Sequence, residues 1–257
     1  MSSATQPGQA PTLVSLLGHP PRRVLLKISG EAFAAPGGFG IDSHELSVIA
    51  EEIRGATATG AQIAVVVGGG NIIRGAALAK AGDIHQATAD YMGMLGTVMN
   101  AAALREKLLT LGVESRVQSA LEIKALAEPF IRGRAIRHLE KGRVVILAAG
   151  TGNPFFTTDT CAALRASELD CDVLLKATKV DGIYSADPQT HPSATRYEHI
   201  TFAEALAQEL GVMDMTALAM CQERALPVLV FNYKTAHNIQ RVISGEPIGT
   251  LVTRARA

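Results

Sequence analysis

The sequence lacks the features that mark several large classes of protein. Its three cysteines, Cys161, Cys171 and Cys221, cannot all pair and form no C-x-x-C motif, which predicts reduced, buried thiols rather than a disulfide framework. Charge of one sign is not in excess either, because 24 Lys and Arg residues balance 24 Asp and Glu residues. Proteins that bind duplex nucleic acid usually carry a basic surplus, so we expect no nucleic-acid partner.

Long hydrophobic runs are missing as well. The longest, at residues 63–67 and 144–149, have about six residues, whereas a membrane-spanning helix needs about 20. Hydrophobic residues still make up 47% of the chain, which is enough for a sizeable core. We therefore expect a cytoplasmic globular protein with no membrane partner.

The N-terminal segment shows no targeting signal. Arg22 and Arg23 suggest a twin-arginine signal, but Lys27 and Glu31 interrupt the apolar stretch that would have to follow. Residues 1–21 contain Pro, Gly, Ser and Gln and are predicted to be a flexible extension. No repeat or change of composition divides the rest, so residues 22–257 are predicted to form a single domain.

Short apolar runs alternate with amphipathic stretches along the chain. The runs are rich in β-branched residues, as in strands buried on both faces of a parallel sheet. The stretches between them have the spacing of amphipathic helices. The pattern predicts an α/β fold, a three-layer α/β/α sandwich with a mainly parallel central sheet. Strands are expected at 24–28, 63–67, 144–148, 173–175 and 228–231, and helices from Asp42 or Ser43, from Met92, and at 157–169, 202–210 and 215–225.

Familiar fingerprints of catalysis and nucleotide binding are also absent. After Gly68-x-Gly70 the sixth position is Ile73, so the dinucleotide motif G-x-G-x-x-G fails, and no Gly-Lys dipeptide exists for a Walker P-loop. The seven histidines are scattered and show no Ser-His-Asp or H-E-x-x-H grouping. A dinucleotide dehydrogenase, a P-loop kinase and covalent catalysis are thereby disfavoured.

Two predicted strand ends carry features that suit phosphates. Lys27 interrupts an apolar strand, and a buried ammonium needs an anion nearby, although a lysine at a sheet edge that reaches water is an alternative. Gly68, Gly69 and Gly70 follow the next strand and let several backbone N–H groups approach one anion, with Arg74 adding charge. A plain tight turn, the alternative, needs only one glycine.

Two later strand ends add hydroxyl, aromatic and acidic groups. Residues 150–159, GTGNPFFTTD, combine glycines and two phenylalanines with Thr-Thr-Asp at a helix start, where anions are favoured. Asp159 is a candidate to hold Mg²⁺ or to orient Lys27, or it only complements the helix dipole. Residues 176–188, KATKVDGIYSADP, suit a nucleoside, or they form a polar hairpin loop. Together these groups favour phosphoryl transfer.

The four segments, in this order, resemble the bacterial-type uridylate kinases (UMP kinases) of the amino acid kinase family. The similarity runs from about Arg23 to Val252, and GTGNPFFTTD and LLKATKVDGIYSADP are its most specific parts. The resemblance implies transfer of the γ-phosphoryl group of ATP to UMP, giving UDP and ADP in pyrimidine nucleotide biosynthesis. It also implies an amino acid kinase-like fold, a homohexamer, inhibition by UTP and activation by GTP.

The resemblance further implies residue roles. Lys27, Arg74 and Asp159 would be catalytic, with Mg²⁺ held mainly by the ATP phosphates and Asp159 its one candidate protein ligand. ATP would contact Lys27, Ile28, Ser29, Gly30, Gly70, Arg74, Thr178, Tyr184 and Asp187. UMP would contact Gly69, Asp90, Thr151, Gly152, Asn153, Pro154, Phe155, Phe156, Thr157 and Thr158. The loop of Gly37, Gly38, Phe39 and Gly40 would belong to the GTP response.

Two other functions remain open on the sequence. A related kinase with an amino acid or carbamate as acceptor would share the ATP half, but GTGNPFFTTD resembles the nucleotide-binding version of that loop. A non-catalytic nucleotide-binding protein would have no need of Lys27, Arg74 and Asp159 together.

Overall fold

The computed structural model describes residues 11–73, 82, 84–188, 190–191, 193–211 and 213–255. Within them a nine-stranded sheet has the order β4-β3-β5-β2-β1-β6-β8-β9-β7. Neighbouring strands run parallel except β8 and β9, which are antiparallel. The strands are β1 (Arg23–Ile28), β2 (Gln62–Val67), β3 (Ser115–Ser119), β4 (Glu128–Pro129), β5 (Val144–Ala148), β6 (Val173–Thr178), β7 (His199–Thr201), β8 (Val228–Asn232) and β9 (Thr250–Thr253).

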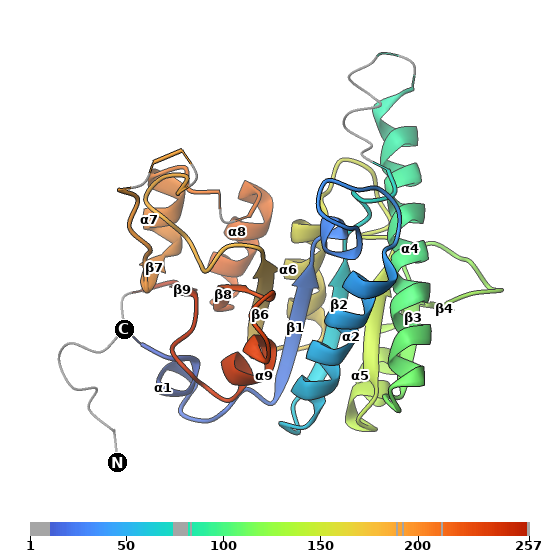
Figure 1. The fold of residues 1–257 in the computed structure, drawn as a ribbon, viewed down its shortest axis with the longest axis horizontal. Helices are drawn as coiled ribbons and strands as arrows, with labels where there is room; N and C mark the ends of the chain where they lie inside the picture. The colour runs from blue at the N-terminus through green and yellow to red at the C-terminus, as the bar shows by residue number, and fades with distance from the viewer. Residues whose placement is uncertain are drawn as a thin grey trace.

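Helices accompany the sheet along its length (Figure 1). The C-terminal part of the chain, with α7 and α8, lies on the left of the view, and the long helix α4 stands on the right. None of the described helices is long and apolar enough to cross a membrane. The helices are α1 (Leu13–Leu17), the 3-10 helix η1 (Gly30–Phe33), α2 (Ser43–Thr57), α4 (Gln86–Thr110), α5 (Arg132–Glu140), α6 (Thr158–Glu168), α7 (Phe202–Ala207), α8 (Met215–Glu223) and α9 (Asn238–Ile243).

The central strands are buried on both faces, which produces two hydrophobic layers. Leu26 and Val65 belong to the core that also contains residues of α2, α4 and α9. Their neighbours Leu25 and Val66 point the other way, into the core that contains residues of α5, α6, α7 and α8. Because side chains alternate along a strand, a strand covered on both sides needs an unbroken apolar run.

This architecture confirms the predicted three-layer α/β/α fold with a mainly parallel sheet. The five expected strands correspond to β1, β2, β5, β6 and β8. The helix expected from Asp42 or Ser43 is α2, and Asp42 caps it through the N–H groups of His44 and Glu45. Strands β3, β4, β7 and β9 were not expected, because they lie toward the sheet edges and are short or polar, as in SRVQS of β3.

Residues 11–21, the described part of the extension that was expected to be flexible, contain a short helix. Thr12 and Ser15 form a capping box at the start of α1, and Leu13 is only 2% exposed. A Cβ on Gly245 would lie 2.2 Å from the Val14 side chain, so this helix packs directly against the chain after α9. One buried leucine with a capped turn docks the segment, which composition alone did not reveal. The domain boundary at residue 21 stays a prediction.

Candidate active site

Two lysines lie at the same level of the neighbouring strands β1 and β6. The sequence V-L-L-K occurs in both strands, and the register pairs Lys27 with Lys176. Residues in register on parallel strands point to the same face of the sheet. Both ammonium groups therefore reach the face that carries α6, near the carboxyl ends of the strands.

Asp159, in the first turn of α6, lies between these two lysines. Its Oδ1 is 2.6 Å from Lys27 Nζ, and its Oδ2 is 2.8 Å from Lys176 Nζ. Thr157 caps the helix by accepting from the N–H groups of Asp159 and Thr160. A carboxylate is also favoured at this position by the helix dipole. We call Lys27, Asp159 and Lys176 the lysine–aspartate cluster.

The cluster is largely buried, and its charges are coupled. Burial by itself raises the pKa of Asp159, but the charges of Lys27 and Lys176 outweigh it and hold that pKa below its usual value. Burial also lowers the pKa of Lys176, and repulsion by Lys27 adds to this against the attraction of Asp159. The carboxylate of Asp214 also attracts the Lys176 ammonium, so two carboxylates act on the two ammonium groups of the cluster.

The glycine turn after β2 is packed against two other backbones. A Cβ on Gly69 would lie 2.5 Å from the carbonyl oxygen of Gly93 on α4. A Cβ on Gly30, at the end of β1, would lie 2.5 Å from the Gly70 nitrogen. Gly70 itself has open space where its Cβ would be. Side chains are therefore excluded beneath the turn, and a ligand can approach its backbone at Gly70.

Two buried asparagines hold this turn in place. Asn71 Nδ2 donates to the carbonyl of Gly40 at 2.7 Å and to Asn100 Oδ1 at 3.0 Å. Asn100 Nδ2 donates in return to the carbonyl of Gly68 and to Asn71 Oδ1, both at 2.7 Å. The pair joins α4, the glycine turn and the loop before α2. Neither asparagine was singled out from the sequence.

The loop between β5 and α6 is held by Asp90, near the start of α4. Asp90 Oδ2 accepts from the N–H of Phe155 at 2.8 Å, and Oδ1 accepts from Gln86 Nε2 at 2.7 Å. Phe155 has a φ of +71°, a conformation that is unfavourable for a residue with a side chain. Asp90 therefore stabilises a strained turn of this loop; its predicted contact with UMP stays a prediction.

A cavity of about 210 Å³ opens between the glycine turn, the β5–α6 loop and α4. We call it the acceptor cavity. It brings together Gly69, Asp90, Thr151, Phe156, Thr157 and Thr158, all predicted UMP contacts. The predicted contacts Gly152, Asn153, Pro154 and Phe155 belong to the same loop but do not line the cavity. The remaining lining residues are Gly70, Ile73, Ala89, Gly93, Met94, Thr97 and Gly150.

A second cavity of about 660 Å³ adjoins the first at Gly70 and Ile73. We call it the glycine-loop cavity, because Gly37, Gly38 and Phe39 line it. Three of the four residues expected to belong to the GTP response thus share a cavity with Gly70, an expected ATP contact, and the fourth, Gly40, does not line it. Its other lining residues are Glu31, Ala34, Ala35, Asn71, Ile72 and Lys179.

The other predicted ATP contacts lie in different surroundings. The Ile28 side chain is in the hydrophobic core, so its backbone alone is available to a nucleotide. Thr178 ends β6 and donates to the carbonyls of Val180 and Phe231, at 2.8 and 3.2 Å. Tyr184 forms an isolated antiparallel bridge with Arg196. Neither cavity is lined by Thr178, Tyr184 or Asp187. Ser29 directly precedes η1. Arg74 lies outside the described residues.

Sequence reasoning missed a second aspartate near the start of α6. Asp214 caps α8 through the N–H of Ala217 at 3.0 Å, and it also accepts from Thr157 Oγ1 at 2.5 Å and Thr160 Oγ1 at 2.9 Å. A helix-capping aspartate is visible in the sequence, but its contact with α6 is not. The sequence places Lys176 near the predicted phosphates, but its ion pair with Asp159 depends on the register of β1 with β6.

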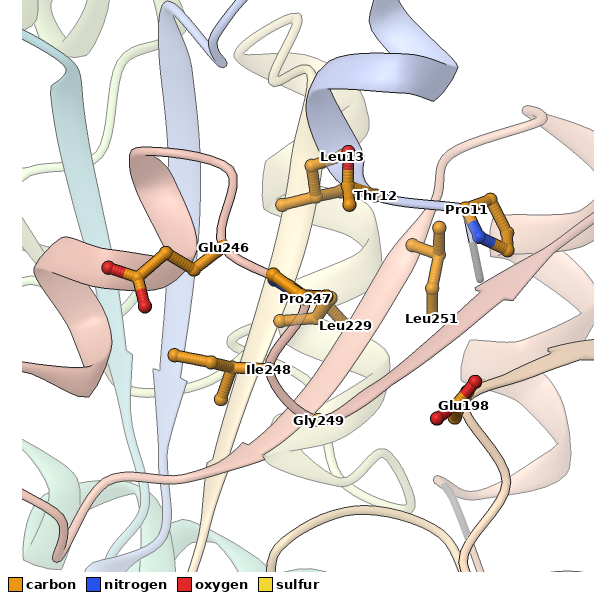
Figure 2. Close-up of a pocket in the computed structure, with 10 residues that line it drawn as sticks. All are labelled: Pro11, Thr12, Leu13, Glu198, Leu229, Glu246, Pro247, Ile248, Gly249 and Leu251. Carbon is orange, nitrogen blue, oxygen red and sulfur yellow. The ribbon is translucent and has the colours of Figure 1, made fainter. Parts of the chain in front are cut away.

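A third cavity, of about 520 Å³, lies beside α1 (Figure 2). Its lining includes the carboxylates of Glu198 and Glu246 and no lysine or arginine. The Glu246 carboxylate is paired with Arg241 at 2.6 Å. It is lined by Pro11, Thr12, Leu13, Glu198, Leu229, Glu246, Pro247, Ile248, Gly249 and Leu251.

The described side chains do not fit a metal cage made by the protein. No three of the described His, Cys, Asp and Glu residues gather closely enough to hold a metal ion. Each carboxylate oxygen of Asp159 already faces an ammonium group. A divalent cation needs oxygen ligands that these residues do not provide, so such an ion would have to enter with a phosphate substrate.

Comparison with known proteins agrees with the fold. Residues 22–232 match the amino acid kinase family. A UMP kinase from Bacillus anthracis is similar over 92% of this chain and 97% of its own, with 39% identity and a TM-score of 0.89. A UMP kinase from Ureaplasma parvum is also 39% identical, over 90% and 98% of the two chains, with a TM-score of 0.83.

A more distant similarity has the same extent. A uridylate kinase from Archaeoglobus fulgidus is 27% identical, over 90% of this chain and 99% of its own, with a TM-score of 0.69. The family match includes the lysine–aspartate cluster, the glycine turn and the β5–α6 loop, all within residues 22–232. The chain belongs to the amino acid kinase family.

Proposed function

We propose that this protein is a UMP kinase, which transfers the γ-phosphoryl group of ATP to UMP and forms UDP and ADP. The observation that carries the proposal is the junction of the two cavities at Gly70, next to the strand end that carries Lys27. Two phosphate groups must meet in such a reaction. The UMP kinases of similar structure and 39% identity favour a nucleoside monophosphate as acceptor.

The acceptor cavity would hold UMP. Its size and the hydroxyl group of Thr158 suit a phosphate at the start of α6, where the positive end of the helix dipole favours an anion. Phe156 offers an aromatic face that is 52% exposed, against which a uracil ring can stack. Asp90 would accept from a ribose hydroxyl while it holds the loop.

ATP would lie on the other side of the glycine turn, with its phosphates toward the glycine-loop cavity. Thr178, Tyr184 and Asp187 would contact the nucleoside, and Arg74 the phosphates. A UMP phosphate oxygen then attacks the γ-phosphorus, and the bridging oxygen leaves with ADP. Lys27 would neutralise the charge that develops during transfer, while Asp159 holds it in position together with Lys176. Mg²⁺ would accompany the ATP phosphates and screen their charge.

A coupled assay of ADP release tests the proposal. Purified protein with Mg-ATP is given UMP, CMP, glutamate or aspartate, and we expect rapid turnover with UMP. Turnover with an amino acid but not with UMP would identify a related kinase with another acceptor. Binding of UMP without turnover, measured by calorimetry, would identify a non-catalytic nucleotide-binding protein. Either result would contradict the proposal.

We further propose a homohexamer that uses the outer face of α4. Tyr91, Leu95 and Met99 are spaced four residues apart and are 41, 49 and 53% exposed. An apolar stripe of this kind is typical of an interface. Leu95→Glu is expected to reduce the mass measured by sedimentation, whereas Met215→Glu, at an exposed position of α8, is expected to leave it unchanged. A wild-type monomer would contradict this assembly.

Regulation by nucleoside triphosphates forms the last part of the proposal. UTP, which shares the uridine of the acceptor, would inhibit, and GTP would activate through the loop of Gly37, Gly38, Phe39 and Gly40. Initial rates at fixed UMP and ATP, with each triphosphate added in turn, test both effects. Rates unchanged by UTP or by GTP would remove that effector from the proposal.

A further inference from the structure

Thr97, in the middle of α4, is a buried hydroxyl to which no role has been given. It is 2% exposed and lines the acceptor cavity. Its Oγ1 donates to the carbonyl of Met94, one turn earlier, at 2.7 Å. The same oxygen accepts from the N–H of Ala149 at 2.7 Å. The first bond is local to the helix, whereas the second links α4 to the end of β5.

Ala149 needs this partner because of where it lies. It follows the last residue of β5 and is 0% exposed, so its N–H has no access to bulk water. A buried backbone N–H without a partner is strongly unfavourable. Ala149 also has a φ of +61° and is followed by Gly150 at +56°. Two consecutive left-handed residues turn the chain sharply, and the left-handed conformation of the alanine requires support.

This turn sets the direction of the β5–α6 loop. The N–H of Gly152 donates to the carbonyl of Ala149 at 3.0 Å, which closes the turn directly before the loop. Thr151, Thr157 and Thr158 then face the acceptor cavity. On the opposite wall, a Cβ on Gly69 would lie 2.9 Å from the Thr97 nitrogen. Thr97 therefore stands where α4 meets both loops of the cavity.

We propose that Thr97 is a positioning residue for the acceptor substrate. Its hydroxyl holds the Ala149–Gly150 turn, and the turn holds the N–H and hydroxyl groups of the β5–α6 loop at the distance that a UMP phosphate requires. Both hydrogen-bonding roles of the hydroxyl are already taken by protein groups, so it acts through the loop rather than on the substrate. This inference rests on the proposed UMP kinase function.

The test compares Thr97→Val, which keeps the shape and removes the hydroxyl, with Thr97→Ser, which keeps the hydroxyl. Thr110→Val is a matched control, because the Thr110 hydroxyl makes the same 2.7 Å bond to the carbonyl three residues earlier on the same helix. Thr97→Val is expected to raise the KM for UMP about tenfold and to change the KM for ATP less than twofold. Thr97→Ser should restore the UMP value, and Thr110→Val should match wild type.

Equal changes in both KM values, or none, would contradict the proposal, because a purely structural role would not act on one substrate selectively. An inactive wild type would instead contradict the proposed function, so the two failures are distinguishable. Hydrogen exchange of wild type at the Ala149 amide gives an answer even if Thr97→Val does not fold. Slow exchange without ligand supports the bond, and exchange as fast as that of the exposed loop would overturn the proposal.

Discussion

The two sides of the lysine–aspartate cluster are built by different means. On the acceptor side a single helix, α4, bonds both loops of the cavity, through Asn100 to the glycine turn and through Asp90 to the β5–α6 loop. On the other side, the segment after β6 is held by elements far along the chain. The N–H of Ile183 donates to Thr250 Oγ1 at 2.9 Å, and Asn232 Nδ2 donates to Asp181 Oδ1 at 3.0 Å.

The difference suggests how each side tolerates change. On the acceptor side the backbones of the glycine turn and α4 are in close contact at Gly69, so a methyl group added there displaces a neighbouring main chain. Several bonds of the segment after β6 involve exposed residues, for which water can substitute. We therefore expect large and substrate-selective effects on the acceptor side, and smaller ones on the other. Substitutions in the cluster, which lies between the sides, should affect the chemical step itself.

The largest effect is expected from Lys27→Ala. The lysine stabilises charge that develops during transfer, so kcat should fall by about 10²–10³-fold, whereas the dissociation constant for UMP should change less than about threefold. Steady-state kinetics and calorimetry measure the two quantities. An unchanged kcat would show that Lys27 does not act in the chemical step and would contradict the role given to the cluster.

Asp159→Asn should affect both rate and stability. It removes the carboxylate that lies between the buried Lys27 and Lys176 and leaves only the weaker attraction of Asp214 for Lys176. We therefore expect kcat to fall at least about tenfold and the melting temperature to fall by about 10 °C at pH 7. Asp170→Asn is the control, since its pair with Arg132 is exposed and should contribute little.

The sign of the pH dependence of stability follows from these charges. Without Asp159, repulsion between the two lysines lowers the pKa of one of them in the folded state, so that lysine loses its charge as pH rises. The variant should therefore be less stable than wild type by an amount that shrinks as pH rises from 7 toward 9.5. In wild type the pKa of Asp159 is lowered, so its contribution is present above the ordinary carboxylate pKa and is lost in more acidic solution. If the difference in melting temperature between wild type and Asp159→Asn instead grows with pH, the lysines do not repel each other.

Gly69→Ala sharpens the comparison on the acceptor side. The added methyl group would lie 2.5 Å from the Gly93 carbonyl and 2.9 Å from the Thr97 nitrogen, so the turn or α4 must move. We expect the KM for UMP to rise about tenfold, with a smaller change for ATP. Gly133→Ala, on α5 with open space at its Cβ, should behave as wild type. An equal rise in the KM values for UMP and for ATP would mean that a change on the acceptor side also alters the ATP side.

The smallest effect is expected from Asn232→Ala, at the end of β8, on the side of the cluster opposite the acceptor cavity. It removes the 3.0 Å bond to Asp181, next to the turn that leads to Tyr184, and the 2.9 Å bond that Asn232 Oδ1 accepts from the N–H of Lys234. The KM for ATP should rise about two- to fivefold and that for UMP should not change. Asn232→Asp, which places a second carboxylate next to Asp181, should raise the KM for ATP further. Insensitivity of ATP binding to both variants would show that this segment does not contact the nucleotide.

The sequence by itself determined the sheet interior and the local chemistry at its edge. Strands such as VVILA of β5 and the glycine turn at 68–70 are local patterns, because burial on both faces and close backbone approach each demand particular residue types. Asp159 forms an ion pair with Lys27, which is one of the three alternatives that the sequence left open for it. Its catalytic role stays a prediction.

Only the tertiary structure decided which distant groups meet. That Lys176 is the second partner of Asp159 follows from the register of β1 with β6, and the contacts of Thr97 and Asp214 follow from packing of helices against loops. Hydrogen bonds across such separations leave no periodic signal in the chain. Composition can require that a buried polar group have a partner, but only the packed fold selects which one.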